Sequence, residues 1–128
     1  MAIRQRLGLL TRSVEEEREA ELGAIGHVRS ALVLRGLLEP EASQEDLLVA
    51  LHAWLGQTPS RMLVVGLSDL VGDRRAVNQP GTLDEYPNWR VPLTDPSGRL
   101  VRLEDVTSAG PDGVAGLAGR IFRALGTH

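Results

Sequence analysis

The sequence predicts a mainly helical chain with one or two short strands. Three observations support this fold class. Apolar residues recur at helical spacing in three segments, at about 14–35, 44–55 and 112–125. One short apolar run, at about 61–67, lacks that period and is typical of a buried strand. A long loop, residues 73–98, contains four prolines and two glycines and has no sustained periodicity.

The first two helices have start and stop signals in the sequence. Ser13 followed by Glu16 is a capping box, and Gly36 supplies a left-handed end to the first helix. The second helix opens at Ser43, with Asp46 three residues later. We therefore place both helix starts by capping chemistry as well as by periodicity.

Each of these helices also has an apolar face. Leu22, Ile25 and Leu32 follow one another at helical spacing in the first helix, and Trp54 and Leu55 belong to the face of the second. We expect Trp54 in the core.

The apolar run at about 61–67 poses a problem of backbone pairing. A strand buried on both faces needs neighbouring strands for its N–H and C=O groups, and no second convincing strand is found in the sequence. Either a second copy of the chain or the remainder of a larger parallel sheet or barrel would supply them. The order helix, helix, strand, long loop, helix fits the last units of an alternating β/α barrel. A helix is the alternative interpretation of this run, and Ser68 or Asp69 is expected to cap one helical turn through Val71.

The C-terminal quarter contains a turn, an irregular piece and a final helix. A turn is expected at 95–98, an extended or irregular segment at 100–106, and a helix starting at Pro111. The apolar stripe of that helix is expected to include Ile121 and Phe122.

Composition excludes several classes of function. The formal net charge of −3 gives no electrostatic basis for binding nucleic acid or an anionic membrane. The chain has no cysteine, and therefore no disulfide, thiolate zinc site or thiol nucleophile. His27, His52 and His128 are far apart and lack metal-like spacing, so neither a metal nor a cofactor is expected. Without a signal peptide or a run of eighteen apolar residues, the expected location is cytoplasmic.

The most specific motif lies in the long loop. Asn78-Gln79-Pro80-Gly81-Thr82, followed by Pro87-Asn88-Trp89, resembles the C-terminal signature of the 4-alpha-glucanotransferases, also called amylomaltases or disproportionating enzymes, of glycoside hydrolase family 77. The resemblance extends to the flanking residues 73–75 and 91–93. It implies that residues 1–128 are a single segment, the C-terminal β/α portion of a TIM-type (β/α)8 barrel.

The resemblance also implies a set of substrate-binding residues. Asn78, Pro80 and Gly81 are expected to touch glucose units of an alpha-1,4-glucan on the donor side. Physically, Pro80 and Gly81 tighten the loop, and the amide of Asn78 offers both a donor and an acceptor to sugar hydroxyls, although a purely structural turn explains them too. Trp89 is included because an indole can stack on a sugar face, although an anchoring role for it is favoured. Tyr86 is expected at the surface or rim.

The family transfers alpha-1,4-glucan segments by retaining double displacement, with an Asp nucleophile, a Glu acid/base and a second Asp that stabilises the transition state. In the family all three precede the region matched here, and no His-Asp pair occurs in the chain. We therefore expect no catalytic residue, and no activity of the chain alone. Asp84 and Glu85 are adjacent in a loop and are not expected to face each other across a scissile bond.

Two partners follow from this interpretation: an alpha-1,4-glucan such as a maltooligosaccharide, and either the rest of the barrel or a second copy of the chain. The alternative is a non-catalytic assembly module that dimerises through the 61–67 strand or the last helix and binds no carbohydrate.

Overall fold

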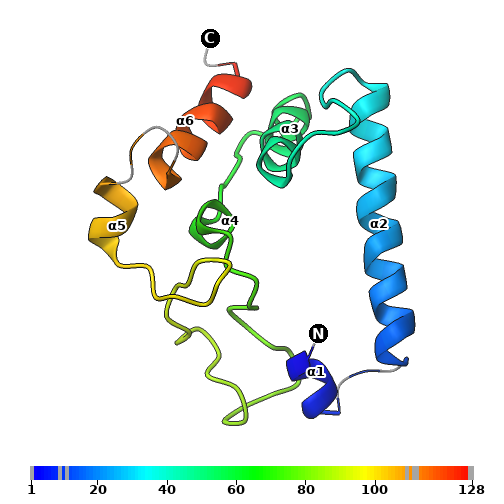
Figure 1. Ribbon diagram of the computed structural model, residues 1–128, viewed down its shortest axis with the longest axis vertical. Coiled ribbons are helices and arrows are strands. Elements are labelled where there is room, and N and C mark those ends of the chain that lie inside the picture. The colour runs from blue at the N-terminus through cyan, green and yellow to red at the C-terminus, as the bar shows by residue number, and fades with distance from the viewer. Residues whose placement is uncertain (1, 9, 11, 109, 111–112, 127–128) are drawn as a thin grey trace. The chain divides into compact units, whose positions relative to one another are not determined.

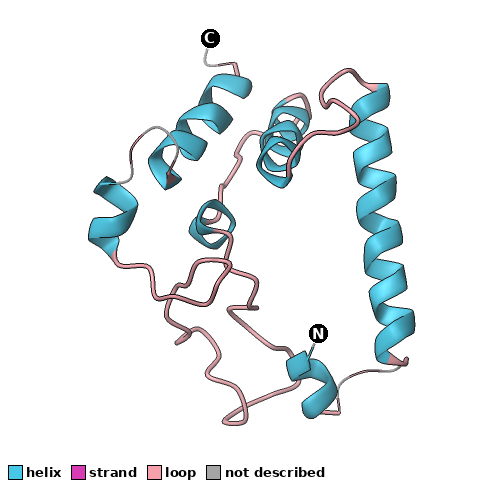
Figure 2. Cartoon of the chain, viewed as in Figure 1, coloured by secondary structure: helices cyan, strands magenta, loops and turns pink. Residues whose placement is uncertain are grey.

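The computed structural model describes residues 2–8, 10, 12–108, 110 and 113–126. In this part of the chain the regular structure is helical, and one isolated antiparallel bridge joins Thr94 to Leu100 (Figures 1 and 2). The helices are α1 (Ala2–Arg6), α2 (Val14–Leu34), α3 (Gln44–Gly56), α4 (Leu67–Val71), α5 (Leu103–Ser108) and α6 (Val114–Ala124). The chain is thus mainly α, as the sequence predicts.

Capping chemistry fixes the starts of α2 and α3. The Ser13 N–H donates to the Glu16 carboxylate at 2.9 Å, and the Glu16 N–H donates back to the Ser13 hydroxyl at 3.2 Å. Ser43 and Asp46 make the same reciprocal pair before α3, at 3.0 and 3.1 Å. Both predicted capping boxes are confirmed.

Gly36 ends α2 in the left-handed conformation, as predicted, with φ of +68°. The N–H of Leu37 reaches back to the Leu32 carbonyl at 3.0 Å, and that of Gly36 to the Val33 carbonyl at 2.9 Å. This pair of bonds is the Schellman motif, which satisfies carbonyls at a helix end.

The chain divides into two compact units, one made of Met1–Val28 with Arg75–Val91 and the other of Arg29–Arg74 with Pro92–His128. The second unit contains most of the core. There α6 packs against α3, α4 and α5, and the side chain of Ile121 is fully buried. The buried apolar residues of this unit are Leu32, Leu38, Ala50, Val71, Leu117 and Ile121.

The strand expected at about 61–67 does not form. Residues 62–66 have no regular secondary structure, and Leu67 already begins α4. The physical reason is the lack of a pairing partner, because among the described residues no neighbouring strand forms hydrogen bonds with this run. Met62 and Val64 are left 81% and 78% exposed.

Local structure differs from the predictions at three further places. The turn of helix through Val71 is present, but its N-cap is Gly66 and no side chain caps it. The segment 100–106 was expected to be extended or irregular, but its residues from Leu103 onward belong to α5. The Asp105 carboxylate accepts the Arg102 N–H at 2.9 Å and so caps the helix start. The predicted helix start at Pro111 lies outside the described residues.

Several side chains on the predicted apolar faces are exposed, and Trp54, expected in the core, is not fully buried. Leu22 and Ile25 on α2 are 60% and 52% exposed, and Phe122 on α6 is 58% exposed. Trp54 is only half-buried, with the Arg35 guanidinium 5.1 Å from its ring centroid in a cation–π contact. Periodicity identified the helices, but it overestimated how much of each face is covered.

No helix in the described part of the chain has the length and apolar character needed to cross a membrane.

Candidate functional site

The long loop is closed at its base by two contacts within the second unit. The Asp73 carboxylate accepts a hydrogen bond from the Thr94 N–H at 2.9 Å. Gly72 lies against Pro96, so that a Cβ on Gly72 would come within 2.8 Å of the proline ring. The two ends of the segment 74–93 are therefore held close together.

Further along the loop, residues 79–82 form a tight turn. The Thr82 N–H and hydroxyl both donate to the Gln79 carbonyl, at 3.3 and 2.6 Å. Pro80 presets φ at the second position, and Gly81 has φ of +85° at the third. This combination is that of a type II β-turn, which requires glycine or asparagine at the third position. Pro80 and Gly81 thus have a defined conformational role.

The side chain of Asn88 joins the two ends of this turn. Its Oδ1 accepts the Gln79 N–H at 2.7 Å, and its Nδ2 donates to the Thr82 carbonyl and hydroxyl at 3.2 and 2.9 Å. One carboxamide therefore makes three hydrogen bonds to the two turn ends.

Asn78 lies immediately before the turn, between two fixed backbone positions. The carbonyl of Val77 accepts the Trp89 N–H at 2.8 Å, and the N–H of Gln79 is held by Asn88. The Asn78 side chain itself is half-buried, and no hydrogen-bond partner for it is found among the described residues. The loop thus presents an amide that retains its capacity to donate and to accept.

Trp89 lies at the surface of the same loop. Its indole is 76% exposed. Its φ of +62° is in the left-handed region, a conformation that costs roughly 1–2 kcal/mol for a residue with a Cβ. The side chain of Trp89 is therefore not buried against the described part of the chain, and its anchoring role stays a prediction. The buried aromatic is Tyr86, expected at the rim but only 5% exposed, whose hydroxyl donates to the Ala76 carbonyl.

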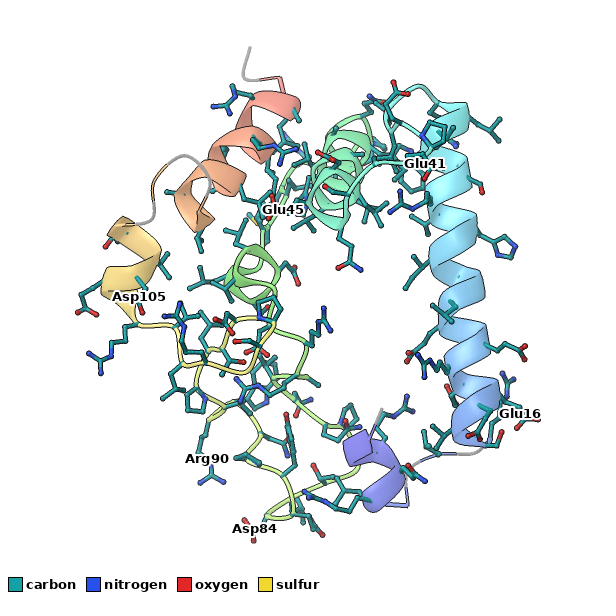
Figure 3. All side chains as sticks on the ribbon, viewed as in Figure 1. Glu16, Glu41, Glu45, Asp84, Arg90 and Asp105 are labelled. Atoms are coloured by element: carbon teal, nitrogen blue, oxygen red, sulfur yellow. The ribbon has the colours of Figure 1, made fainter. Side chains whose placement is uncertain are left out.

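The two adjacent acidic residues of the loop are Asp84 and Glu85. The Glu85 carboxylate accepts the Leu83 N–H at 2.7 Å, and this bond lowers its pKa below the ordinary value. Asp84 and Arg90 project from the loop ribbon in Figure 3. In the described part of the chain, no group of three or more His, Asp or Glu side chains is placed to hold a metal ion.

The sequence therefore identified the candidates Asn78 and Trp89 but missed the side chains that hold this loop together. Asn88 and Tyr86 make their bonds to residues six to ten positions away. The only sequence signal for them was their place within the motif.

Comparison with known proteins agrees with the motif. Residues 10–97 match the 4-alpha-glucanotransferase family, glycoside hydrolase family 77. The chain is 51% identical over 106 residues to the 4-alpha-glucanotransferases of Mycobacterium bovis and Mycobacterium tuberculosis. The match covers 81% of this chain but only 15% of each relative, so the chain spans a small part of their length. No solved structure matches the chain. The chain belongs to the 4-alpha-glucanotransferase family.

Proposed function

We propose that this chain is the C-terminal part of a 4-alpha-glucanotransferase barrel, and that its loop 78–90 contributes to the donor side of an alpha-1,4-glucan site. The whole enzyme transfers glucan segments by retaining double displacement. The chain supplies no catalytic carboxylate, and the rest of the barrel provides them. Alone, the chain binds glucan but does not transfer it.

The observation that carries this proposal is the pairing of Asn78 and Trp89 in one fixed loop. The Trp89 N–H donates to the carbonyl of Val77, the residue directly before Asn78. One backbone hydrogen bond therefore joins the two segments that carry the candidates. Sugar rings are bound in proteins by these two kinds of group, a planar apolar face and an amide that meets hydroxyls. The strained φ of Trp89 is also typical of functional positions.

Exposed apolar side chains support the idea that the chain is part of a larger barrel. The run 62–66 has no ladder partner in the described residues, and Met62 and Val64 are left bare. Adjacent parallel strands would satisfy the backbone groups of this run and cover its side chains. The exposed Leu22 and Ile25 of α2 are a second apolar surface that further protein would cover.

The proposal is tested by titrating the 128-residue chain with maltoheptaose and following tryptophan fluorescence. In a Trp54→Phe background the only indole is that of Trp89, so the signal reports the loop alone. We expect a saturable change in fluorescence that is lost in Asn78→Ala. We expect no response to cellohexaose, in which glucose units are joined by beta linkages and form a chain of different shape. Absence of any response to maltoheptaose, with the helical circular dichroism spectrum intact, contradicts the proposal.

The second candidate is an assembly module that binds no carbohydrate, and the exposed run at 62–66 favours it. The chain would then form a tight dimer by pairing this run with its twin. Sedimentation equilibrium separates the two. A dimer that dissociates in Val64→Lys, together with no response to maltoheptaose, favours the module, whereas glucan binding that persists in Val64→Lys favours the glucan site.

A further inference from the structure

We propose that Asn88 is a positioning residue, which holds the 79–82 turn closed and thereby fixes how Asn78 and Trp89 are presented to a glucan. Asn88 itself is not required to touch the sugar. The inference rests on the proposed glucan-binding role of the loop, and it adds the residue on which the geometry of that site depends.

Both polar atoms of the Asn88 side chain have hydrogen-bond partners in the turn. Its Oδ1 meets a donor, the Gln79 N–H, while its Nδ2 meets two acceptors of Thr82. Since a flipped amide would set donor against donor at Gln79 and acceptor against acceptor at the Thr82 carbonyl, only one orientation satisfies both ends. The carboxamide therefore bonds to the turn with both an acceptor and a donor, as a backbone peptide group does in a β-ladder.

Removing this carboxamide would leave buried polar groups without partners. Gln79 is only 6% exposed, so its N–H is poorly placed to bond to water in place of Asn88. Thr82 would keep its two bonds to the Gln79 carbonyl, but the turn would no longer be tied to residues 86–89. The backbone on the C-terminal side of Asn78 would then be free to move.

The effect of Asn88 is confined to the loop. Among the described residues, its side-chain bonds end on Gln79 and Thr82, whereas the stability of the second unit depends on the buried residues around α6. A change at Asn88 should therefore alter glucan affinity without altering the helical fold. Ordering a loop on binding costs conformational entropy, and this cost appears as lost affinity.

The test compares maltoheptaose affinity in Trp54→Phe chains with and without Asn88→Ala. We expect Asn88→Ala to bind about tenfold more weakly, with unchanged circular dichroism, because part of the binding free energy must then order the loop. Glu41→Gln is the control: it alters an exposed polar side chain outside loop 78–90, and it should bind as the parent does.

Asn88→Asp supplies a readout that a general loss of stability would not give. In this variant a protonated carboxyl group accepts the Gln79 N–H and donates to the Thr82 carbonyl, whereas the ionised form has no proton to donate. Its affinity should therefore recover as the pH falls from about 5 to about 3, through the ordinary range of an aspartic acid pKa. The parent chain shares every other ionisable group, so the difference between the two pH profiles reports the carboxyl group introduced by Asn88→Asp.

Each outcome has a distinct meaning. Weaker binding by Asn88→Ala and an acid-dependent rescue of Asn88→Asp support the positioning role. If Asn88→Ala binds as tightly as the parent, or Asn88→Asp follows the parent's pH profile, the inference is wrong while the proposed function stands. If the parent chain does not respond to maltoheptaose at all, the proposed function and this inference fail together. If Asn88→Ala does not fold, the Asn88→Asp profile decides alone.

Discussion

The guanidinium of Arg120 on α6 binds the carboxylate of Asp46 in the first turn of α3. The same carboxylate completes the capping box with Ser43, and Arg120 also reaches Glu45 at 3.4 Å. These bonds lower the pKa of Asp46, with the Ser43 hydroxyl as the largest cause and Arg120 next. One carboxylate thus starts α3 and ties it to α6.

This arrangement predicts an acid-sensitive contribution to stability. Because the pKa of Asp46 is lowered in the folded chain, its contribution is present above the ordinary value of 3.8 and is lost as the pH falls through the lowered pKa. We expect the melting temperature of the wild-type chain to fall more steeply between pH 7 and about 3 than that of Asp46→Asn. Glu41→Gln, at an exposed carboxylate before α3 (Figure 3), should follow the wild type. Parallel slopes for Asp46→Asn and the wild type would contradict this role.

Two neighbouring residues of α6 should respond very differently to truncation. Ile121 is fully buried, and Ile121→Ala should lower the free energy of unfolding by about 2–5 kcal/mol through lost burial and the cavity left behind. Phe122 is 58% exposed, and Phe122→Ala should cost less than about 1 kcal/mol. Urea denaturation followed by circular dichroism measures both. Equal losses would show that α6 is not packed as described.

Two glycine-to-alanine changes should have opposite effects. Gly81→Ala places a Cβ at φ of +85°, which costs roughly 1–2 kcal/mol and should weaken maltoheptaose binding by about five- to thirtyfold. Gly26→Ala lies inside α2, where a Cβ meets nothing within 4 Å, and should raise the free energy of unfolding by up to about 1 kcal/mol. Glucan affinity should be unchanged in Gly26→Ala. A Gly81→Ala chain that binds as the parent does would rule out a requirement for the type II turn.

Substitution of Trp89 by glycine should weaken glucan binding without lowering the stability of the fold. Glycine adopts φ of +62° without steric cost, so Trp89→Gly should unfold no more easily than the parent, although an exposed aromatic residue has been lost. Its affinity for maltoheptaose, measured by isothermal titration calorimetry, should fall by about tenfold or more if the indole stacks on the sugar, which corresponds to at least about 1.4 kcal/mol. A destabilised Trp89→Gly chain with normal affinity would instead support the anchoring interpretation.

The helices could be predicted because their signals are local. A capping box joins residues three apart, as in Ser13 with Glu16, and the end of α2 depends on one glycine. The strand at 61–67 was wrong for this chain because strand formation depends on ladder partners distant in sequence or on another chain. Helix α5 was missed because six residues are too few to show a period.

The candidate site could be predicted only in part. Motif and residue chemistry identified Asn78, Pro80, Gly81 and Trp89, and the left-handed φ of Gly81 agrees with its expected role in a turn. The burial of Tyr86 could not be predicted, since it follows from a bond to a carbonyl ten residues away. The exposure of an aromatic side chain in a loop depends on such contacts, and a single sequence does not specify them.

The most direct test of glucan binding by residues 78–90 is a maltoheptaose titration of the isotope-labelled chain followed by nuclear magnetic resonance. We predict saturable shifts in the Asn78 side-chain amide, the backbone amides of the 79–82 turn and the indole N–H of Trp89, with the amides of α3 and α6 unchanged. Shifts confined to other parts of the chain, or none at saturating maltoheptaose, would contradict a glucan site in this loop.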